Sequence, residues 1–167
     1  DYDGCDFHAL LDARVEEGEI VLPSGMRYRL LLLPAKKRMR VAVVERIAEL
    51  ADKGAIVISP VRPEASPSLG EMGEGDKKVR ALVMDSWSGE SESPAGSEEI
   101  IFTKDKDLGK LLTELNILPD FSYASNQAAD IRYIHRLTDD CDVYFLSNQQ
   151  EGTVSFEAVF RQSDGRK

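Results

Sequence analysis

The chain has 167 residues, 42% of them hydrophobic and 31% charged, which is the composition of an ordinary globular domain. Its 21 Lys and Arg residues against 30 Asp and Glu residues give a net charge of −9. This balance disfavours nucleic acids and anionic membrane surfaces as partners, because both need a basic protein face. The longest apolar run, residues 30–34, is far too short to span a bilayer.

The chain begins with Asp1 rather than Met, and its first residues lack both the basic start and the apolar core of a signal peptide. We therefore expect it to be a piece of a longer protein. The two cysteines, Cys5 and Cys141, lack the spacing of a metal site and do not indicate a disulfide framework. No metal and no cofactor is expected.

The first part of the chain predicts a short helix followed by a linker. Apolar residues recur at helical spacing over residues 6–13, and Asp6 precedes them as a candidate N-cap. The acidic residues 16–19 and the Pro-Ser-Gly sequence at 23–25 predict loops and a turn.

Residues 27–58 have the pattern of a βαβ unit. Residues 27–33 end in four consecutive leucines, as expected for a strand that is covered on both faces. Residues 39–53 carry a single apolar stripe at helical spacing, and Gly54 follows where a left-handed C-cap is needed. Residues 55–58 predict a second buried strand, so the two strands should be adjacent and parallel, with the helix packed across them.

The middle of the chain continues this α/β pattern. The glycine-rich residues 70–75 lack the Lys-Ser/Thr pair of a phosphate-binding loop and carry glutamates, so they predict an ordinary loop. Trp87 falls on the apolar stripe of its helix and is expected in the core. The expected elements are a loop at 59–76, a helix at 77–87, a connector at 89–98, a short strand at 99–102 and a helix at 107–115.

The last third of the chain changes character. Residues 131–137, 142–148 and 153–160 alternate in polarity or are rich in aromatic side chains, and the connectors between them are short enough for hairpins. We expect these three strands to form an antiparallel meander that follows the α/β unit.

Several motifs resemble one enzyme family. Residues 131–148, IRYIHRLTDDCDVYFLSN, followed by a strand that ends in Phe-Arg, resemble the C-terminal side of the α-L-rhamnosidases of glycoside hydrolase family 106. The motifs YRLLLLP, AELADKGA and ILPDF also have counterparts there, in the same order, over roughly residues 3–161. The resemblance implies a bacterial, periplasmic or secreted parent that hydrolyses terminal α-L-rhamnosides of plant polysaccharide. Its catalytic carboxylates would belong to a (β/α)-barrel domain outside this chain.

The α/β unit also resembles the flavodoxin-like fold of class I glutamine amidotransferases. A working amidotransferase needs a Cys nucleophile on a tight turn after a strand, but Ser59 and Pro60 stand there and neither Cys lies nearby. We therefore expect an α/β, flavodoxin-like fold without the amidotransferase chemistry. The expected division is an N-terminal helix and linker at 1–26, the α/β domain at 27–130 and an antiparallel strand extension at 131–167.

His135 and Arg136 are the first candidate site residues, and two interpretations are open. In one, His135 is a half-buried histidine bonded to backbone, and Arg136 pairs with Asp139 or Asp140 across the turn. In the other, one of the pair points toward a sugar, because planar side chains with several donors and acceptors suit sugar hydroxyls. The resemblance favours the second interpretation, since the His-Arg pair and Asn148 match the motif of the family.

Glycoside hydrolysis needs two carboxyl groups at a fixed separation, and the sequence predicts no such pair. Asp120, after Leu118 and Pro119, is the best placed carboxylate, with a plain turn residue as its alternative role. We therefore expect no catalytic residue here, and candidate substrate contacts at His135, Arg136, Asn148 and Asp120.

The resulting hypothesis is a non-catalytic accessory domain of a glycoside hydrolase. It would pack on the catalytic barrel of the same polypeptide and border the sugar cleft, so that a carbohydrate at the domain interface is the expected ligand. The alternative is a stand-alone oligomerisation or ligand-binding module with a degenerate amidotransferase-like fold.

Overall fold

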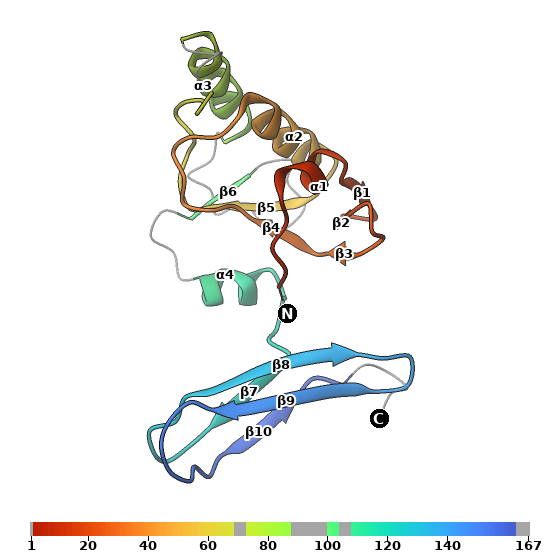
Figure 1. Ribbon diagram of the computed structural model, residues 1–167, viewed down its shortest axis with the longest axis vertical. Coiled ribbons are helices and arrows are strands. Elements are labelled where there is room, and N and C mark those ends of the chain that lie inside the picture. The colour runs from red at the N-terminus through yellow and green to blue at the C-terminus, as the bar shows by residue number, and fades with distance from the viewer. Residues whose placement is uncertain (1, 69–72, 88–99, 104–107, 163–167) are drawn as a thin grey trace. The chain divides into compact units, whose positions relative to one another are not determined.

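The computed structural model describes residues 2–68, 73–87, 100–103 and 108–162 (Figure 1). The chain divides into two compact units, Gly4–Asn116 and a second unit of Ile117–Lys167 with Asp1–Asp3. The boundary falls after Asn116, whereas the division expected from the sequence has boundaries after residues 26 and 130. Among the described residues, no helix is both long enough and apolar enough to cross a membrane.

Helix α1 (Phe7–Leu11) begins the first unit as the sequence predicts. The side chain of Asp6 accepts a hydrogen bond of 2.9 Å from the backbone N–H of Ala9, so the expected N-cap is confirmed.

A small antiparallel sheet follows α1, where the sequence predicted only loops. A tight turn joins its first two strands, with positive φ values of 55° at Glu17 and 80° at Gly18, as required by a two-residue hairpin turn. The predicted loop at 16–19 is therefore confirmed at residues 17 and 18 and wrong at Glu16 and Glu19, which belong to strands too short for their alternation to be recognised. The strands are β1 (Arg14–Glu16), β2 (Glu19–Val21) and β3 (Arg27–Tyr28), in the order β1-β2-β3.

The expected βαβ unit is confirmed. Strand β4 (Leu30–Leu32) pairs in parallel with β5 (Ile56–Ser59), which pairs in parallel with β6 (Ile101–Phe102). The predicted single strand at 27–33 is wrong, because its first two residues form β3 in the antiparallel sheet and the leucines form β4. The coverage expected on both faces is also wrong at Leu32, which is 47% exposed at the edge of this sheet.

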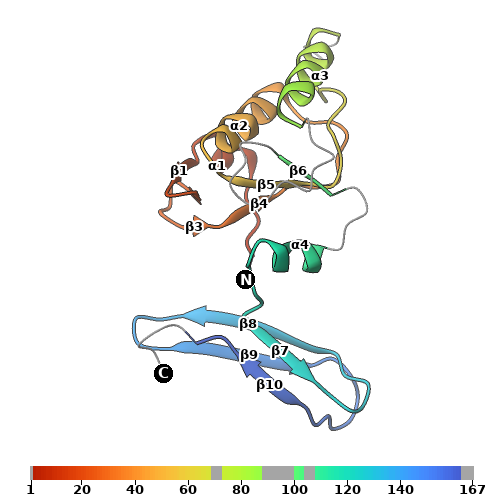
Figure 2. The same cartoon turned by 180° about the vertical axis from the view of Figure 1, so that it is seen from behind.

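Three helices cover the parallel sheet. Helix α2 (Val41–Asp52) and helix α3 (Glu74–Ser86) lie on one face, and α4 (Leu108–Glu114) lies on the other (Figures 1 and 2). Gly54, at φ 90°, ends α2 as predicted: its N–H bonds to the carbonyl of Ala51, and the next N–H bonds to that of Leu50.

Helix α3 begins earlier than predicted, at Glu74, so the expected loop at 59–76 is shorter. The predicted connector at 89–98 lies outside the described residues, as do residues 70–72 of the glycine-rich loop and the first residues, 99 and 107, of two predicted elements.

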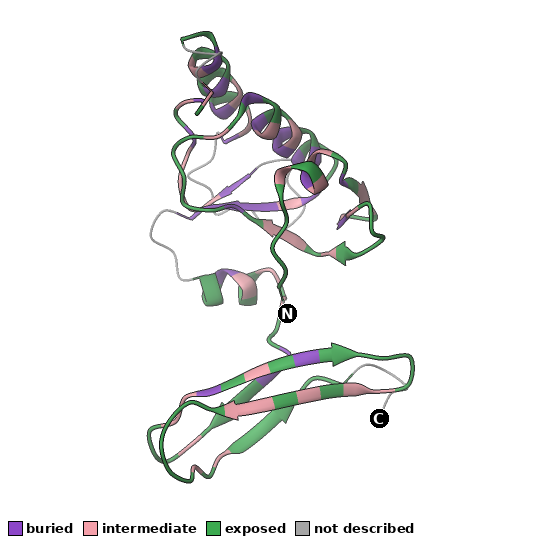
Figure 3. Cartoon of the chain, in the orientation of Figure 1, coloured by how far each residue is buried: buried purple, intermediate pink, exposed green. Residues whose placement is uncertain are grey.

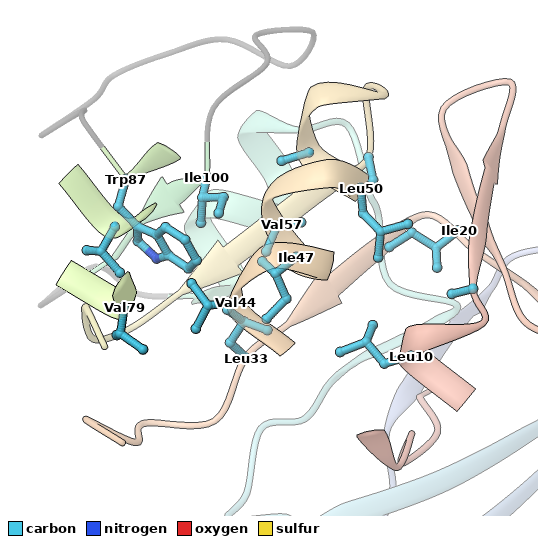
Figure 4. Packing of buried hydrophobic residues seen from close by; sticks show 14 of the residues in the cluster. Leu10, Ile20, Leu33, Val44, Ile47, Leu50, Val57, Val79, Trp87 and Ile100 are labelled. Atoms are coloured by element: carbon cyan, nitrogen blue, oxygen red, sulfur yellow. The ribbon is translucent and has the colours of Figure 1, made fainter. Parts of the chain in front are cut away.

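The main hydrophobic core lies between the parallel sheet and helices α2 and α3 (Figure 4). Ile47 of α2 and Val57 of β5 are fully buried, and Trp87 is 1% exposed, which confirms its predicted place in the core. A smaller cluster of Ile58, Ile101 and Leu111 packs α4 against the opposite face of the sheet. The first unit is therefore a mixed α/β structure with its core concentrated on the α2–α3 side.

The second unit consists of two antiparallel ribbons. Strands β8 (Ile131–Leu137) and β9 (Asp142–Asn148) form the predicted hairpin, with Ile131 opposite Asn148. Strand β10 (Glu157–Phe160) pairs with β7 (Phe121–Ala124) and not with β9, so the predicted meander is wrong in its last step. Because β7 was not recognised in the sequence, β9 was the partner that remained for β10.

Aromatic side chains pack the two ribbons face to face. The ring centroid of Phe121 lies 5.2 Å from those of both Tyr133 and Phe160, and Tyr144 lies 5.0 Å from Phe160. The chain as a whole combines a small parallel sheet flanked by helices with antiparallel sheets. The three parallel strands follow one another in the order β4-β5-β6, without the reversal of order typical of flavodoxin-like sheets.

Candidate functional site

Two of the four candidate residues, Asp120 and His135, meet inside the second unit. The imidazole of His135 lies between two carboxylates: Nδ1 is 2.9 Å from Oδ2 of Asp120, and Nε2 is 2.9 Å from Oδ1 of Asp142. The three side chains are between 4% and 9% exposed. These residues form a buried network of ionisable groups.

The register of the hairpin determines which side chains take part in this network. His135 pairs directly with Tyr144, and Leu137 pairs with Asp142 at the turn end of the hairpin. Side chains alternate along a strand, so His135, Tyr144 and Asp142 all point to the inner face, toward β7 and β10. The rings of His135 and Tyr144 stack with centroids 4.2 Å apart and 5° between their planes.

Arg161, just after β10, closes the network. Its guanidinium pairs with the carboxylate of Asp120, and its backbone N–H donates to the carbonyl of Asp120 at 2.8 Å. Its own carbonyl accepts a hydrogen bond of 2.6 Å from the Tyr144 hydroxyl. The network therefore links residues from the beginning of β7, both strands of the hairpin and the end of β10.

The number of N–H groups on the imidazole limits which hydrogen bonds it can donate in this network. A neutral imidazole has one N–H, whereas the imidazolium has two, so between two ionised carboxylates the imidazolium is the form that donates to both. In that form, His135 together with Arg161 would balance two ionised carboxylates in charge. This balance is what a buried set of charges requires.

The same contacts set the pKa of Asp120. Burial acts to raise this pKa, but the hydrogen bond from His135 and the positive charge of Arg161 outweigh it, so the pKa lies below its ordinary value. Burial raises the pKa of both Tyr133 and Tyr144. A general acid for glycoside hydrolysis needs the opposite, a carboxyl group whose pKa is raised. Asp120 is therefore ionised and well suited to an ion pair.

Arg136 and Asn148 lie apart from this network. The guanidinium of Arg136 donates to the carbonyl of His135 at 3.1 Å, and its side chain is on the opposite face of the hairpin. Asn148 organises the turn after β9: its Nδ2 donates to the carbonyl of Gly152 at 3.0 Å, and its Oδ1 accepts from the N–H of Gln150 at 3.1 Å. The four candidate residues thus do not converge on one point.

Sequence reasoning missed Asp142, Tyr144 and Arg161. Alternation along 142–148 places Asp142 and Tyr144 on one face, and this signal was available. Arg161 joins through the pairing of β10 with β7, which no local pattern reveals. Among the residues that the structure describes, no group of three or more His, Cys, Asp or Glu side chains is arranged to hold a metal ion.

The comparisons with known proteins identify the class of protein. The whole chain, residues 1–167, matches the family model described as alpha-L-rhamnosidase. The chain therefore belongs to glycoside hydrolase family 106, the α-L-rhamnosidase family, as the motifs of its last third indicated.

Two relatives are bacterial and much longer. A Formosa agariphila protein named "Putative beta-glucuronidase" is 31% identical over 164 residues, which is 98% of this chain and 13% of that protein. The structure of a rhamnosidase from Novosphingobium sp. PP1Y matches with a TM-score of 0.81 and 32% identity, over 96% of this chain and 15% of that chain. The chain thus spans about one seventh of the proteins that it matches, and these have further domains.

Proposed function

We propose that this chain is a non-catalytic accessory part of a family 106 glycoside hydrolase. It packs on the catalytic barrel of the same polypeptide and borders the sugar cleft. The observation that carries the proposal is the state of Asp120, the best placed carboxylate: it is buried, ionised and paired with His135 and Arg161. A carboxylate held in this way orders the fold and is not available for proton transfer to a glycosidic oxygen.

The parent polypeptide is proposed to be a bacterial, periplasmic or secreted enzyme that cleaves terminal α-L-rhamnosides. Membership of the family supports this substrate. The name of the Formosa relative makes β-glucuronides the second substrate class to test.

A finer proposal concerns the ancestry of the α/β unit. A degenerate amidotransferase-like fold is supported by the parallel βαβ arrangement and by a serine at the end of β5. The hydroxyl of Ser59 is buried and donates to the carbonyl of Val61 at 2.6 Å. A side chain held in this way helps to fix the end of the strand.

The test compares the purified chain with its full-length parent on an aryl α-L-rhamnoside and an aryl β-glucuronide. The parent is expected to turn over one of them, and the chain neither. In the parent, Asp120→Asn and Asp142→Asn should lower the melting temperature and leave kcat of the folded enzyme within about twofold, because neither group acts on the transition state. Asp140→Asn, at an exposed position, is the control and should change neither.

Turnover by the purified chain that disappears in Asp120→Asn or Asp142→Asn, but not in Asp140→Asn, would overturn the proposal. It would place a catalytic carboxylate within these 167 residues.

A further inference from the structure

The hairpin of the second unit presents an apolar face on the side opposite its buried network. Ile134 and Phe145 are directly paired across the strands, and Val143 lies beside them. These three side chains are 48%, 69% and 47% exposed, respectively. The outer face of the hairpin consists of Arg132, Ile134, Arg136, Val143, Phe145 and Ser147.

The outer face differs from the inner face in what covers it. Over residues 142–146 of β9, partly buried inner residues alternate with exposed outer ones, as Figure 3 shows along this strand. The inner residues Tyr133 and Tyr144 pack against the aromatic rings of β7 and β10. Adjoining exposed apolar side chains on one face of a sheet mark an interaction surface more often than a plain solvent face.

The composition of the outer face fits a protein surface as its partner. Aromatic residues and arginines are enriched at the centre of protein interfaces, and here Phe145 lies among two arginines and two aliphatic side chains. Both arginines place positive charge on this face, and Arg132 also pairs with Asp130 at 3.7 Å. A surface that is apolar at its centre and acidic at its rim would complement them.

The comparisons show that the matched proteins are much longer than this chain. This chain aligns with its relatives over 96% and 98% of its length, so the hairpin belongs to the shared segment, but it spans only 15% and 13% of those proteins. Most of the matched polypeptide lies outside the chain. A second copy is a poorer partner, because a symmetric contact would gather four arginines in one interface, where like charges oppose association.

We propose that the outer face docks on an apolar surface with an acidic rim that belongs to another part of the parent polypeptide. Phe145 and Ile134 form the centre of the contact, and Arg132 and Arg136 face the acidic rim. This inference rests on the proposed function only in requiring a longer parent. It does not depend on which glycoside the parent cleaves.

The test measures whether the outer face is accessible in the chain and in its parent. Both proteins carry Cys5→Ser and Cys141→Ser, to remove the native thiols, and either Phe145→Cys or Val159→Cys. Val159 is the matched control, because it is an exposed apolar strand residue of the other ribbon, 68% exposed against 69% for Phe145. A maleimide labels the thiols, and mass spectrometry of the peptide that contains each site gives the labelling rate.

In the isolated chain, the two sites should label at similar rates. In the parent, the rate at Phe145→Cys should fall by at least about tenfold, since labelling then needs local opening of the contact, and the rate at Val159→Cys should stay within about twofold. Addition of Arg136→Glu should restore much of the lost labelling at position 145, because it places a negative charge against the acidic rim.

Fast labelling at position 145 in the parent would overturn the proposal, and so would an equal loss at both sites. Slow labelling already in the isolated chain would also overturn it: dependence on concentration would then identify a second copy as the partner, and independence would identify the rest of this chain. Substrate turnover by the parent is measured separately, so failure of the proposed function is distinguishable from failure of the docking face.

Discussion

In the unit Gly4–Asn116, the interior is made by aliphatic side chains between a parallel sheet and two helices, with Trp87 among them. In the unit that contains β7 to β10, the buried residues include the ionisable pair Asp120 and His135. The side chain of Asp142, which contacts His135, is only 4% exposed as well. One unit is stabilised mainly by removal of apolar surface from water, the other by aromatic packing around a complete set of charges.

This difference indicates how each unit should respond to change. An apolar core tolerates a change of pH and loses stability in proportion to the volume deleted. A buried charge network is sensitive to the loss of any single member, because the remaining charges stay buried without a partner. The predictions below test this contrast.

The largest effect is expected from His135→Ala, which leaves Asp120 and Asp142 buried with one cation fewer. The expected cost is about 3–5 kcal/mol of the second unit's free energy of unfolding, the range for removal of one partner from a buried ion pair. Hydrogen exchange of the β8 and β9 amides measures it. His8→Ala is the control, because the other histidine of the chain is 74% exposed and should cost less than about 0.5 kcal/mol.

A triple variant sharpens this result. Asp120→Asn, His135→Leu and Asp142→Asn together remove the charges that a single change leaves behind, so the triple variant should be more stable than His135→Ala. A triple variant that is the less stable of the two would mean that the side chains act through shape and not through charge.

The next effect is expected from Ile47→Ala, which deletes a fully buried side chain of α2. The cost should be about 2–5 kcal/mol, from the lost apolar contacts and the cavity left behind. Trp87 is the only tryptophan of the chain and lies in the same core, so its fluorescence reports unfolding of this unit. Glu45→Ala, at an exposed position of the same helix, should change stability by less than about 0.5 kcal/mol.

The contrast between the units also explains which parts of the fold the sequence predicted. The βαβ unit was predictable because apolar periodicity and Gly54 agree with the tertiary packing. Strands β1, β2 and β7 were missed because each has three or four residues, too few for alternation to be distinguished from a loop, and β3 was predicted as the start of one strand with β4. The pairing of β10 depended on β7, so one missed strand led to a wrong partner.

The candidate site was predictable in part for the same reason. His135 and Asp120 were selected from local sequence, but their contact joins residues fifteen positions apart through packing of two ribbons. Strand alternation already places Arg136 on the face opposite His135, but local pattern could not show that Asn148 serves its own turn. The motif that signals the family therefore holds residues with three different roles.

A smaller effect is expected from acid, because it acts on Asp120 while the side chain stays in place. The folded state lowers the pKa of Asp120, so its contribution to stability is complete above the pKa of the unfolded chain. That contribution is lost as the pH falls through the lower pKa of the folded state. The ionisable side chains around this carboxylate are Asp142, His135, Arg161, Tyr133 and Tyr144.

The free energy of unfolding of the second unit should therefore fall below about pH 4. In Asp120→Asn, which is less stable at neutral pH, this free energy should change less over the same acid range. Hydrogen exchange of the hairpin amides at several pH values measures this dependence in both proteins. If the free energy of unfolding changed equally with pH in the two proteins, Asp120 would not be the group that titrates.

The smallest effect is expected from Asn148→Ala. Asn148 makes two hydrogen bonds within its own turn, to Gly152 and Gln150, and it is exposed. Exposed hydrogen bonds lie at the low end of a net contribution of about 0.5–1.5 kcal/mol each, so the loss should be about 0.5–1 kcal/mol. It should be confined to the turn, where faster exchange of the turn amides reports it. Gln150→Ala is the control, because the bond to Asn148 uses the backbone N–H that alanine retains.

In the full-length parent, KM for the rhamnoside should be the same in both variants. A raised KM in Asn148→Ala, with unchanged exchange at the turn, would instead identify Asn148 as a sugar contact. The last third of the chain would then contribute to the substrate site.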